Sequence, residues 1–230
     1  MATPKLVVVD LDGTLVDSLP DIAFCINRML TELSLPTVGQ ERVGEWVGNG
    51  TEVLVRRALA GDMHGKADEG YYARALPIFT QLYAQHTSDR SRVYDGVPEG
   101  LEFLRASGVA LACVTNKASA FTHKLLADLE LDAYFTLVIS GDTLARKKPD
   151  PLPLLHAARH FSVSPDKGLL IGDSANDVKA ARAAGFGIVC VSYGYNHGND
   201  IRASMPDAVI DSLAELPGLF VVSAQARTAS

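Results

Sequence analysis

The sequence predicts an α/β protein in which a parallel sheet forms the core and an all-helical domain is inserted into that core. Two observations carry this prediction. Short apolar runs alternate with amphipathic stretches along most of the chain, which is typical of parallel strands joined by helices. One long interval breaks the alternation, because it has helical patterning and no convincing strand.

Six short apolar runs are the expected strands. Most are continuous rather than alternating, which predicts strands covered by helices on both faces. The runs are Lys5–Asp10, Ala110–Thr115, Leu137–Ser140, Leu169–Gly172, Gly187–Ser192 and Ala208–Asp211. Helices fit between them, and the first, Pro98–Ser107, begins with a proline suited to a first turn and stops before a glycine. The other core helices are expected at Ala118–Leu129, Leu152–Phe161 and Ala175–Ala184.

The inserted domain is predicted between the first two long strands. Helical patterning there covers Pro20–Leu33, Gln40–Val47, Thr51–Ala60 and Tyr71–Gln85. About 75 residues of helix are too many for an ordinary crossover between strands. We therefore expect residues 1–16 and 95–220 to form the α/β core, residues 17–94 to form a helical domain over it, and residues 221–230 to be a polar tail.

Composition narrows the class of function. The 230 residues carry a net charge of -6 without a clustered basic face, which argues against nucleic-acid binding. No apolar run approaches the roughly 18 residues of a membrane span. Cys25, Cys113 and Cys190 lie far apart and are expected to be buried thiols in a reducing compartment. We expect a cytoplasmic monomer or homodimer that binds a small molecule.

Four polar clusters fall at the ends of expected strands. They are Asp10-Leu-Asp12-Gly-Thr14, Thr115-Asn116-Lys117, Lys147-Lys148-Pro149-Asp150 and Gly172-Asp173-Ser174-Ala175-Asn176-Asp177. Open α/β sheets bind ligands at the carboxyl ends of their strands. A single acidic residue there is often only a helix cap. Four clusters gathered at one edge instead predict a binding site.

The combined chemistry of these clusters favours a phosphoryl group. Carboxylates from the first and fourth clusters would lie close together, and a hard divalent cation such as Mg²⁺ would relieve their repulsion. Lys148, with the hydroxyl and amide groups of Thr115 and Asn116, would supply donors for an anion. The site therefore offers both a place for a metal and a place for a phosphate.

The four clusters, in this order and with a helical insert after the first, resemble the motifs of the haloacid dehalogenase superfamily of phosphatases. The resemblance implies a Rossmann-like parallel sheet with a helical cap domain. Two further stretches, Trp46–Gly50 (WVGNG) and Ser192–Gly198 (SYGYNHG), resemble those of bacterial phosphoglycolate phosphatases.

The resemblance implies a role for each motif. Asp10 would attack phosphorus and form an aspartyl-phosphate. Asp12 would protonate the leaving alkoxide and then deprotonate the hydrolytic water. Thr115, Asn116 and Lys148 would bind the phosphoryl oxygens as negative charge spreads over them.

The resemblance also implies a Mg²⁺ site. Asp10, the backbone carbonyl of Asp12 and Asp173 would be its ligands. Asp177 would either bind the metal directly or hold its waters and Lys148, and we favour the second arrangement because Mg²⁺ usually keeps several waters.

The remaining candidates concern the substrate. Gly13 would let the chain turn sharply beside the phosphate. The loop around Asn49 would either direct free amides at the active site or be a plain turn between helices. Arg57, or its neighbour Arg56, is a candidate partner for a substrate carboxylate. Asp17 is expected to be a helix-start residue.

The leading interpretation is a Mg²⁺-dependent phosphomonoester hydrolase that converts 2-phosphoglycolate to glycolate and phosphate. A phosphosugar phosphatase and a phosphosugar mutase of the same superfamily remain alternatives. A binding protein without catalysis is a third, but it would be free to lose Asp10, Asp12, Lys148 or Asp173, and all four are present.

Overall fold

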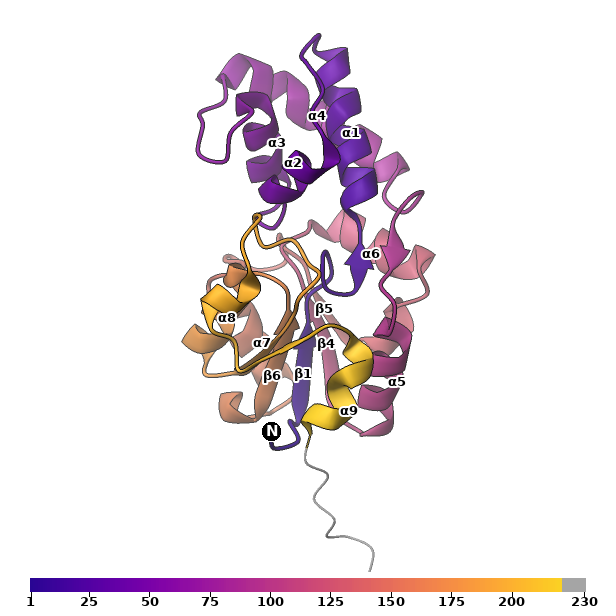
Figure 1. The fold of residues 1–230 in the computed structure, drawn as a ribbon, viewed down its shortest axis with the longest axis vertical. Helices are drawn as coiled ribbons and strands as arrows, with labels where there is room; N and C mark the ends of the chain where they lie inside the picture. Colours follow the sequence, from indigo (N-terminus) through magenta and orange to yellow (C-terminus); the bar gives the residue numbers. More distant parts are fainter. Residues whose placement is uncertain (221–230) are drawn as a thin grey trace, which may run out of the picture.

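The computed structural model of the protein describes residues 1–220, and a six-stranded parallel sheet forms its core (Figure 1). The strand order is β5-β4-β1-β6-β7-β8, and every neighbouring pair is parallel. The strands are β1 (Leu6–Val9), β4 (Ala110–Val114), β5 (Leu137–Ile139), β6 (Gly168–Gly172), β7 (Gly187–Val191) and β8 (Ala208–Ile210). The predicted fold class is confirmed, and the polar tail expected at 221–230 lies outside the described residues.

Strand β1 lies near the middle of the sheet and is covered on both faces. Its side chains are fully buried and alternate in direction, as strand geometry requires. Val7 and Val9 pack in one apolar cluster with residues of α5, α6 and α9, whereas Leu6 and Val8 pack in another with α7 and α8. Figure 1 shows α5 and α9 on one side of the sheet and α7 and α8 on the other. This double cover explains why the strands are continuous apolar runs.

The helices of the core begin and end close to the predicted residues. They are α5 (Val97–Ala106), α6 (Ser119–Asp128), α7 (Leu152–His160), α8 (Ala175–Ala184) and the short α9 (Leu216–Leu219). The described part of the core also has four 3₁₀ turns: Asp132–Tyr134, Pro165–Lys167, Ile201–Ser204 and Leu213–Glu215. None of the helices in residues 1–220 combines the length and the apolar character that a membrane crossing requires.

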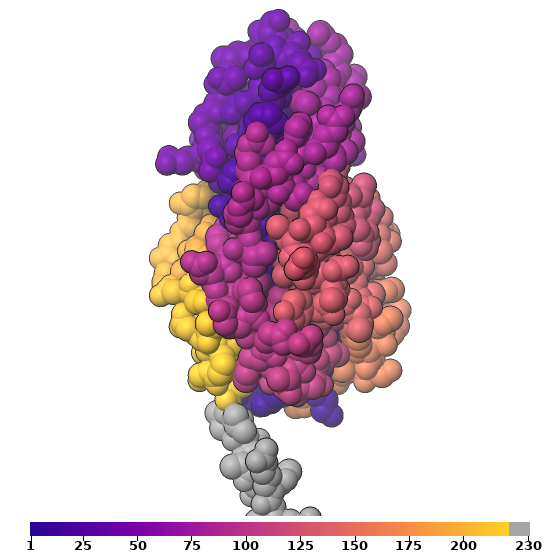
Figure 2. Space-filling view, turned by 90° about the vertical axis from the view of Figure 1, so that its right-hand side faces the viewer, coloured from indigo at the N-terminus to yellow at the C-terminus, as the bar shows by residue number. Residues whose placement is uncertain are grey.

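Four further helices form a lobe beyond the carboxyl ends of the strands. They are α1 (Leu19–Glu32), α2 (Gln40–Trp46), α3 (Thr51–Ala60) and α4 (Glu69–Gln85). They share an apolar cluster of their own, built around buried residues such as Met29, Trp46 and Phe79. Figure 2 shows this helical lobe, indigo to purple, stacked on one end of the core. The name helical lobe is used below for α1 to α4 and the loops that join them.

Two very short strands connect the lobe to the core. Strands β2 (Val16–Asp17) and β3 (Arg92–Val93) pair antiparallel, so the outgoing and returning segments lie side by side. The sequence predicted no strand between Asp17 and about Tyr94, and that prediction is wrong for β3. Two residues are too few to produce a recognisable period, and β3 exists because β2 pairs with it.

A buried aspartate fixes the connection between lobe and core. Asp21 lies in the first turn of α1, and its carboxylate accepts hydrogen bonds from Arg90 N–H (2.8 Å), Ser91 N–H (2.7 Å) and Ser91 Oγ (2.8 Å). The Arg90 guanidinium adds an ion pair at 3.2 Å. A buried carboxylate is tolerated only with such partners, so Asp21 holds the start of α1 against the returning chain.

Replacing Asp21 by alanine is expected to lower the free energy of unfolding by about 2–4 kcal/mol, because two buried N–H groups and a hydroxyl lose their acceptor. Chemical denaturation followed by circular dichroism measures the loss. Glu32→Ala, an exposed position at the other end of α1, is the matched control and should change stability by less than about 0.5 kcal/mol. Equal effects from the two variants would contradict this role for Asp21.

Candidate active site

Three neighbouring strands bring the polar clusters together. Strands β4, β1 and β6 are adjacent, and Thr115, Asp10 and Asp173 are the residues that follow or nearly follow their carboxyl ends. Parallel strands end at the same edge of a sheet, so these side chains share one site although they lie far apart in the sequence. The loop after β5 returns Lys148 to the same place.

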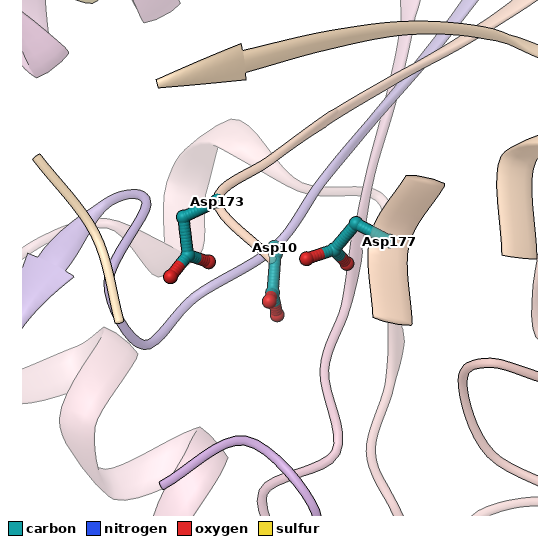
Figure 3. A group of neighbouring side chains, drawn as sticks. All are labelled: Asp10, Asp173 and Asp177. Atoms are coloured by element: carbon teal, nitrogen blue, oxygen red, sulfur yellow. The ribbon is translucent and has the colours of Figure 1, made fainter. Parts of the chain in front are cut away.

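Three carboxylates form the centre of the site. Each of Asp10, Asp173 and Asp177 offers an oxygen, and these oxygens lie within 4.8 Å of one another. Figure 3 shows Asp10 between the other two, with all three side chains directed into a common space. All three residues are buried, Asp177 completely.

Burial and mutual repulsion control the protonation of this cluster. Burial raises the pKa of Asp10 from 3.8 to about 7; Lys148 opposes the rise and the charge of Asp177 adds to it. Burial also raises the pKa of Asp173 well above its usual value, with further contributions from Asp177 and Asp10. For Lys148, burial opposes the charge, but the two neighbouring carboxylates hold its pKa above the usual value.

Lys148 bridges two members of the cluster. Its Nζ lies 2.9 Å from Oδ1 of Asp10 and 2.7 Å from Oδ1 of Asp177. The other oxygen of Asp177 accepts hydrogen bonds from the N–H (3.1 Å) and Oγ (2.6 Å) of Ser174, which forms the capping box of α8. Both oxygens of Asp177 therefore have protein donors, an arrangement suited to orienting Lys148.

Asp173 is held by the loops around it. Its Oδ1 accepts a hydrogen bond from Thr14 Oγ1 (3.0 Å), and its Oδ2 accepts one from the N–H of Tyr195 (2.6 Å). Gly13 passes close by with a φ of +84°, and a Cβ at that position would lie 2.4 Å from Oδ2 of Asp173. Only glycine permits both the positive φ and this approach, so Gly13 shapes the edge of the cluster.

Thr115 and Asn116 follow β4 at the same edge, and both are buried. The Thr115 hydroxyl accepts a hydrogen bond from the Lys117 N–H (3.2 Å) and lines the cavity between core and lobe. The Asn116 side chain instead donates from Nδ2 to the carbonyls of Gly48 and Lys148, both at 2.9 Å. The Asn116 side chain therefore joins the helical lobe to the Lys148 loop.

A metal ion fits this donor set. Three buried carboxylates at this spacing carry more negative charge when ionised than the ammonium of Lys148 balances. Burial first, and then the neighbouring carboxylates, raise the pKa of Asp10 and of Asp173, so a cation that enters the cluster would be favoured. Hard divalent cations prefer such oxygen ligands, and Mg²⁺ is typically held by one or two carboxylates with water and phosphate.

A small cavity lies between the core edge and the helical lobe, with a volume of about 50 Å³, which is room for only a few water molecules. Its core side is formed by Asp10, Asp12, Thr115, Asn116 and Lys117. Its lobe side is formed by Ile22, Val47, Gly48, Gly50, Thr51, Leu54, Phe79 and Tyr83. A ligand there would meet polar groups on one side and mostly apolar groups on the other.

Asp12 faces this cavity and is held by residues that the sequence analysis did not assign. Its Oδ1 accepts hydrogen bonds from Ser18 Oγ (2.6 Å) and Lys117 Nζ (2.9 Å). The same ammonium donates to the hydroxyl of Tyr83, on α4, at 2.5 Å. The position of Lys117 directly after Thr115-Asn116 was a signal for its involvement, whereas nothing in the local sequence marked Tyr83.

Asn49 and Arg57, expected at the substrate, do not line the cavity beside Asp10. The Arg57 guanidinium donates to the Trp46 carbonyl (2.8 Å), the Met63 carbonyl (3.2 Å) and Oδ1 of Asn49 (2.9 Å). Both side chains instead border a separate hollow formed with residues 141–150. The Arg57 guanidinium holds the loop, and Gly48 and Gly50 face the cavity beside Asp10. A substrate contact by Asn49 or Arg57 stays a prediction.

Two other residues from the sequence analysis have clear positions. Asp17 accepts a hydrogen bond from the N–H of Leu19 (3.3 Å), as expected of a residue at the start of α1, and also from the Tyr195 hydroxyl (2.5 Å). His197 reaches from the loop after β7 to the helical lobe, where its Nδ1 lies 2.7 Å from the Glu45 carbonyl. Burial lowers the pKa of His197.

The parallel sheet, its acidic edge and the helical lobe over that edge define an α/β protein whose carboxylate site is covered by a helical domain. The chain belongs to the haloacid dehalogenase-like hydrolase family, whose model matches residues 7–191. The phosphoglycolate phosphatase of Nitrosococcus oceani is 56% identical over 217 residues, covering 94% of this chain and 96% of that protein. That of Nitrosospira multiformis is 49% identical over 216 residues, covering 94% and 95%.

Solved structures agree with the sequence relatives. A crystal structure described as a predicted phosphoglycolate phosphatase from Haemophilus somnus 129pt superposes with a TM-score of 0.90 at 36% identity. The match covers 95% of this chain and 99% of that one. Together with the named relatives, this likeness shows that the chain is an enzyme, a phosphatase.

Without metal, the free energy of unfolding is expected to fall as pH rises from 3.8 to about 7, because the folded chain keeps a proton on Asp10 that the unfolded chain has lost. Mg²⁺ binding displaces that proton, so added Mg²⁺ should raise Tm more at pH 8 than at pH 6. At about 100 times its Kd, the stabilisation is about 2.7 kcal/mol. Thermal unfolding with and without Mg²⁺ measures both effects.

The control for this experiment separates the cluster from general salt effects. Asp173→Asn should lose most of the Mg²⁺-dependent rise in Tm, whereas Asp132→Asn, an exposed position outside the site, should retain it. A Tm that does not change with Mg²⁺ at either pH would contradict the metal site. An equal Mg²⁺-dependent rise in the Tm of both variants would also contradict it.

Proposed function

We propose that this chain is a Mg²⁺-dependent phosphomonoester hydrolase that works through an aspartyl-phosphate on Asp10, with 2-phosphoglycolate as its substrate. One observation supports the mechanism most strongly. Asp10 and Asp12, two residues apart at the end of a central strand, both border the same small cavity, and each is paired with a different buried lysine.

Asp10 is the nucleophile in this proposal. Its Oδ1 accepts hydrogen bonds from the N–H of Leu11 (2.7 Å) and from Lys148 (2.9 Å), which fixes the orientation of the carboxylate. The second oxygen is then presented in a constant direction for attack on phosphorus, which forms the acyl phosphate and expels the alkoxide.

Asp10, Asp173 and the backbone carbonyl of Asp12 would hold the metal, with Asp177 orienting Lys148. When bound, Mg²⁺ would offset the negative charge of the carboxylates and of the phosphate. The hydrogen bonds from Thr14 and Tyr195 to Asp173 would keep that ligand in position.

Asp12 is the proton carrier. It would give its proton to the leaving alkoxide and, after the alkoxide departs, take a proton from the water that hydrolyses the aspartyl-phosphate. The hydrogen bond from Ser18 Oγ fixes its side chain at the cavity. Thr115, the backbone amide of Asn116 and Lys148 would stabilise the charge on the phosphoryl oxygens.

Two observations favour 2-phosphoglycolate over a phosphosugar. The relatives that are 56% and 49% identical over nearly the whole chain are named phosphoglycolate phosphatase. The cavity of about 50 Å³ is small, so a hexose would need a larger displacement of the helical lobe than a two-carbon acid. A mutase would also need space for a sugar to rebind in a second orientation.

Asp10→Asn is expected to reduce kcat for 2-phosphoglycolate by about 10⁴-fold or more, because the amide cannot attack phosphorus. Phosphate release in the presence of Mg²⁺ measures the loss, and unchanged circular dichroism confirms the fold. Asp132→Asn is the matched control and should keep wild-type turnover. Comparable activity in Asp10→Asn and wild type would rule out this nucleophile.

The wild-type enzyme is expected to have a higher kcat/KM for 2-phosphoglycolate than for glucose 1-phosphate, with free phosphate as the product of each turnover. Steady-state kinetics and product analysis on a panel of phosphate esters test this. Formation of glucose 6-phosphate would support the mutase instead. Absence of phosphate release from the whole panel would support a binding protein without catalysis.

A further inference from the structure

Lys117 occupies a position that the catalytic scheme does not explain. Its side chain is only 4% exposed, and its ammonium lies between Asp12 on the core and Tyr83 on the helical lobe. Burying an ammonium is costly unless it has anionic or polar partners. Neither nucleophilic attack nor metal binding requires a cation at this point.

We propose that Lys117 is a specificity-determining residue whose ammonium binds the carboxylate of the substrate. This inference rests on the proposed function, since it takes the substrate to be a short phosphorylated carboxylic acid. It assigns the recognition of the carboxylate to the loop after β4, supported by α4, rather than to Arg57.

The spacing of groups supports this assignment. Asp12 contacts the ester oxygen of the substrate in the proposed mechanism, and the Lys117 ammonium lies 2.9 Å from the same Asp12 carboxylate. In 2-phosphoglycolate a single methylene separates the ester oxygen from the carboxylate carbon. A group that close to the ester oxygen comes within reach of Lys117, and a longer chain would carry its carboxylate past it.

The surroundings of Lys117 strengthen an ion pair at this position. An ammonium has three N–H donors, and Lys117 directs them at Oδ1 (2.9 Å) and Oδ2 (3.3 Å) of Asp12 and at the Tyr83 hydroxyl. A substrate carboxylate would replace the longest of these bonds. The lobe side of the cavity contributes apolar side chains, including Leu54 and Phe79, and a low local dielectric favours pairing of opposite charges. Burial raises the pKa of Tyr83 well above its usual value, so its hydroxyl stays neutral beside the ammonium.

Other cations near the site are already engaged. Among the residues lining the cavity, all within 1–220, Lys117 is the only cation. Lys148 pairs with Asp10 and Asp177, and Arg57 donates to carbonyls and to Asn49 within the helical lobe. Lys147 borders the separate hollow on the other side of Gly50. The substrate carboxylate therefore has one suitable partner in the cavity.

The test compares 2-phosphoglycolate with ethyl phosphate, which has a methyl group in place of the carboxylate. For Lys117→Gln the ratio of the two kcat/KM values should fall by about 10- to 100-fold, the usual strength of a charge-assisted hydrogen bond. Lys147→Gln, a neighbouring lysine outside the cavity, is the matched control and should keep the wild-type ratio. The fraction of correctly folded enzyme cancels in this ratio, because both kcat/KM values are measured on the same preparation.

A binding measurement adds a readout that does not depend on turnover. In the Asp10→Asn background, calorimetry should show that Lys117→Gln weakens the binding of 2-phosphoglycolate much more than the binding of ethyl phosphate. Tyr83→Phe keeps the ring and removes the hydroxyl that holds Lys117. The ratio of kcat/KM for 2-phosphoglycolate to kcat/KM for ethyl phosphate should therefore lie between the ratios of wild type and Lys117→Gln. If Lys117→Gln is inactive, the Tyr83→Phe ratio decides the question.

The outcomes distinguish this inference from the proposed function. If wild type prefers 2-phosphoglycolate and Lys117→Gln keeps that preference while losing rate on both esters, Lys117 only positions Asp12 and the inference is overturned. An unchanged ratio in Tyr83→Phe would overturn it when Lys117→Gln is inactive. If wild type does not prefer 2-phosphoglycolate over ethyl phosphate, both the proposed substrate and the inference fail.

Discussion

The burial of several carboxylates at the end of a central strand is the constraint on which the rest of the site depends. Asp10 cannot leave this position, because β1 is fully buried and ends there. Each buried carboxylate needs polar partners. Lys148 pairs with Asp10 and Asp177, and Ser174 donates hydrogen bonds to the other oxygen of Asp177. Thr14 and Tyr195 donate hydrogen bonds to Asp173. Burial keeps the pKa of Asp10 near 7, so the charge on the cluster responds to any cation that enters. A cluster of carboxylates that repel one another is well suited to bind a metal ion together with a phosphate.

The helical lobe closes the site by contacts with backbone carbonyls. Asn116 donates to the carbonyl of Gly48, Asn176 donates to the same carbonyl at 3.3 Å, and His197 lies 2.7 Å from the carbonyl of Glu45. These bonds join the loop after β4, the first turn of α8 and the loop after β7 to residues 45–48, at the end of α2 and just beyond it. The cavity is small because this segment lies close to the strand ends. One set of contacts therefore both holds the lobe over the site and limits the size of the cavity.

Most of the fold and the centre of the site could be predicted from the sequence, and the reason is topological. Continuous apolar runs are a strong local signal for buried parallel strands, and parallel strands collect their carboxyl ends at one edge. Asp10, Thr115 and Asp173 were therefore assignable to one site. Contacts between distant residues could not be read in this way: Tyr83 meets Lys117 across 34 positions, and Lys117 meets Asp12 across 105. The same limit explains Arg57, whose charge suggested a ligand, whereas its donors hold the loop of the lobe. Strand β3 was not predicted, because two residues are too few to show the alternating pattern of a strand.

The proposed mechanism requires that Asp10 becomes covalently phosphorylated in each turnover. The most direct measurement mixes the enzyme with Mg²⁺ and radiolabelled substrate, quenches the reaction in acid within milliseconds, reduces the protein with borohydride and maps the product by mass spectrometry. If Asp10 is the nucleophile, the protein will carry an acid-stable, hydroxylamine-sensitive label, and borohydride will convert Asp10 to homoserine. Phosphate release without protein-bound label at any quench time, or reduction at Asp12 or Asp173 in place of Asp10, would contradict it.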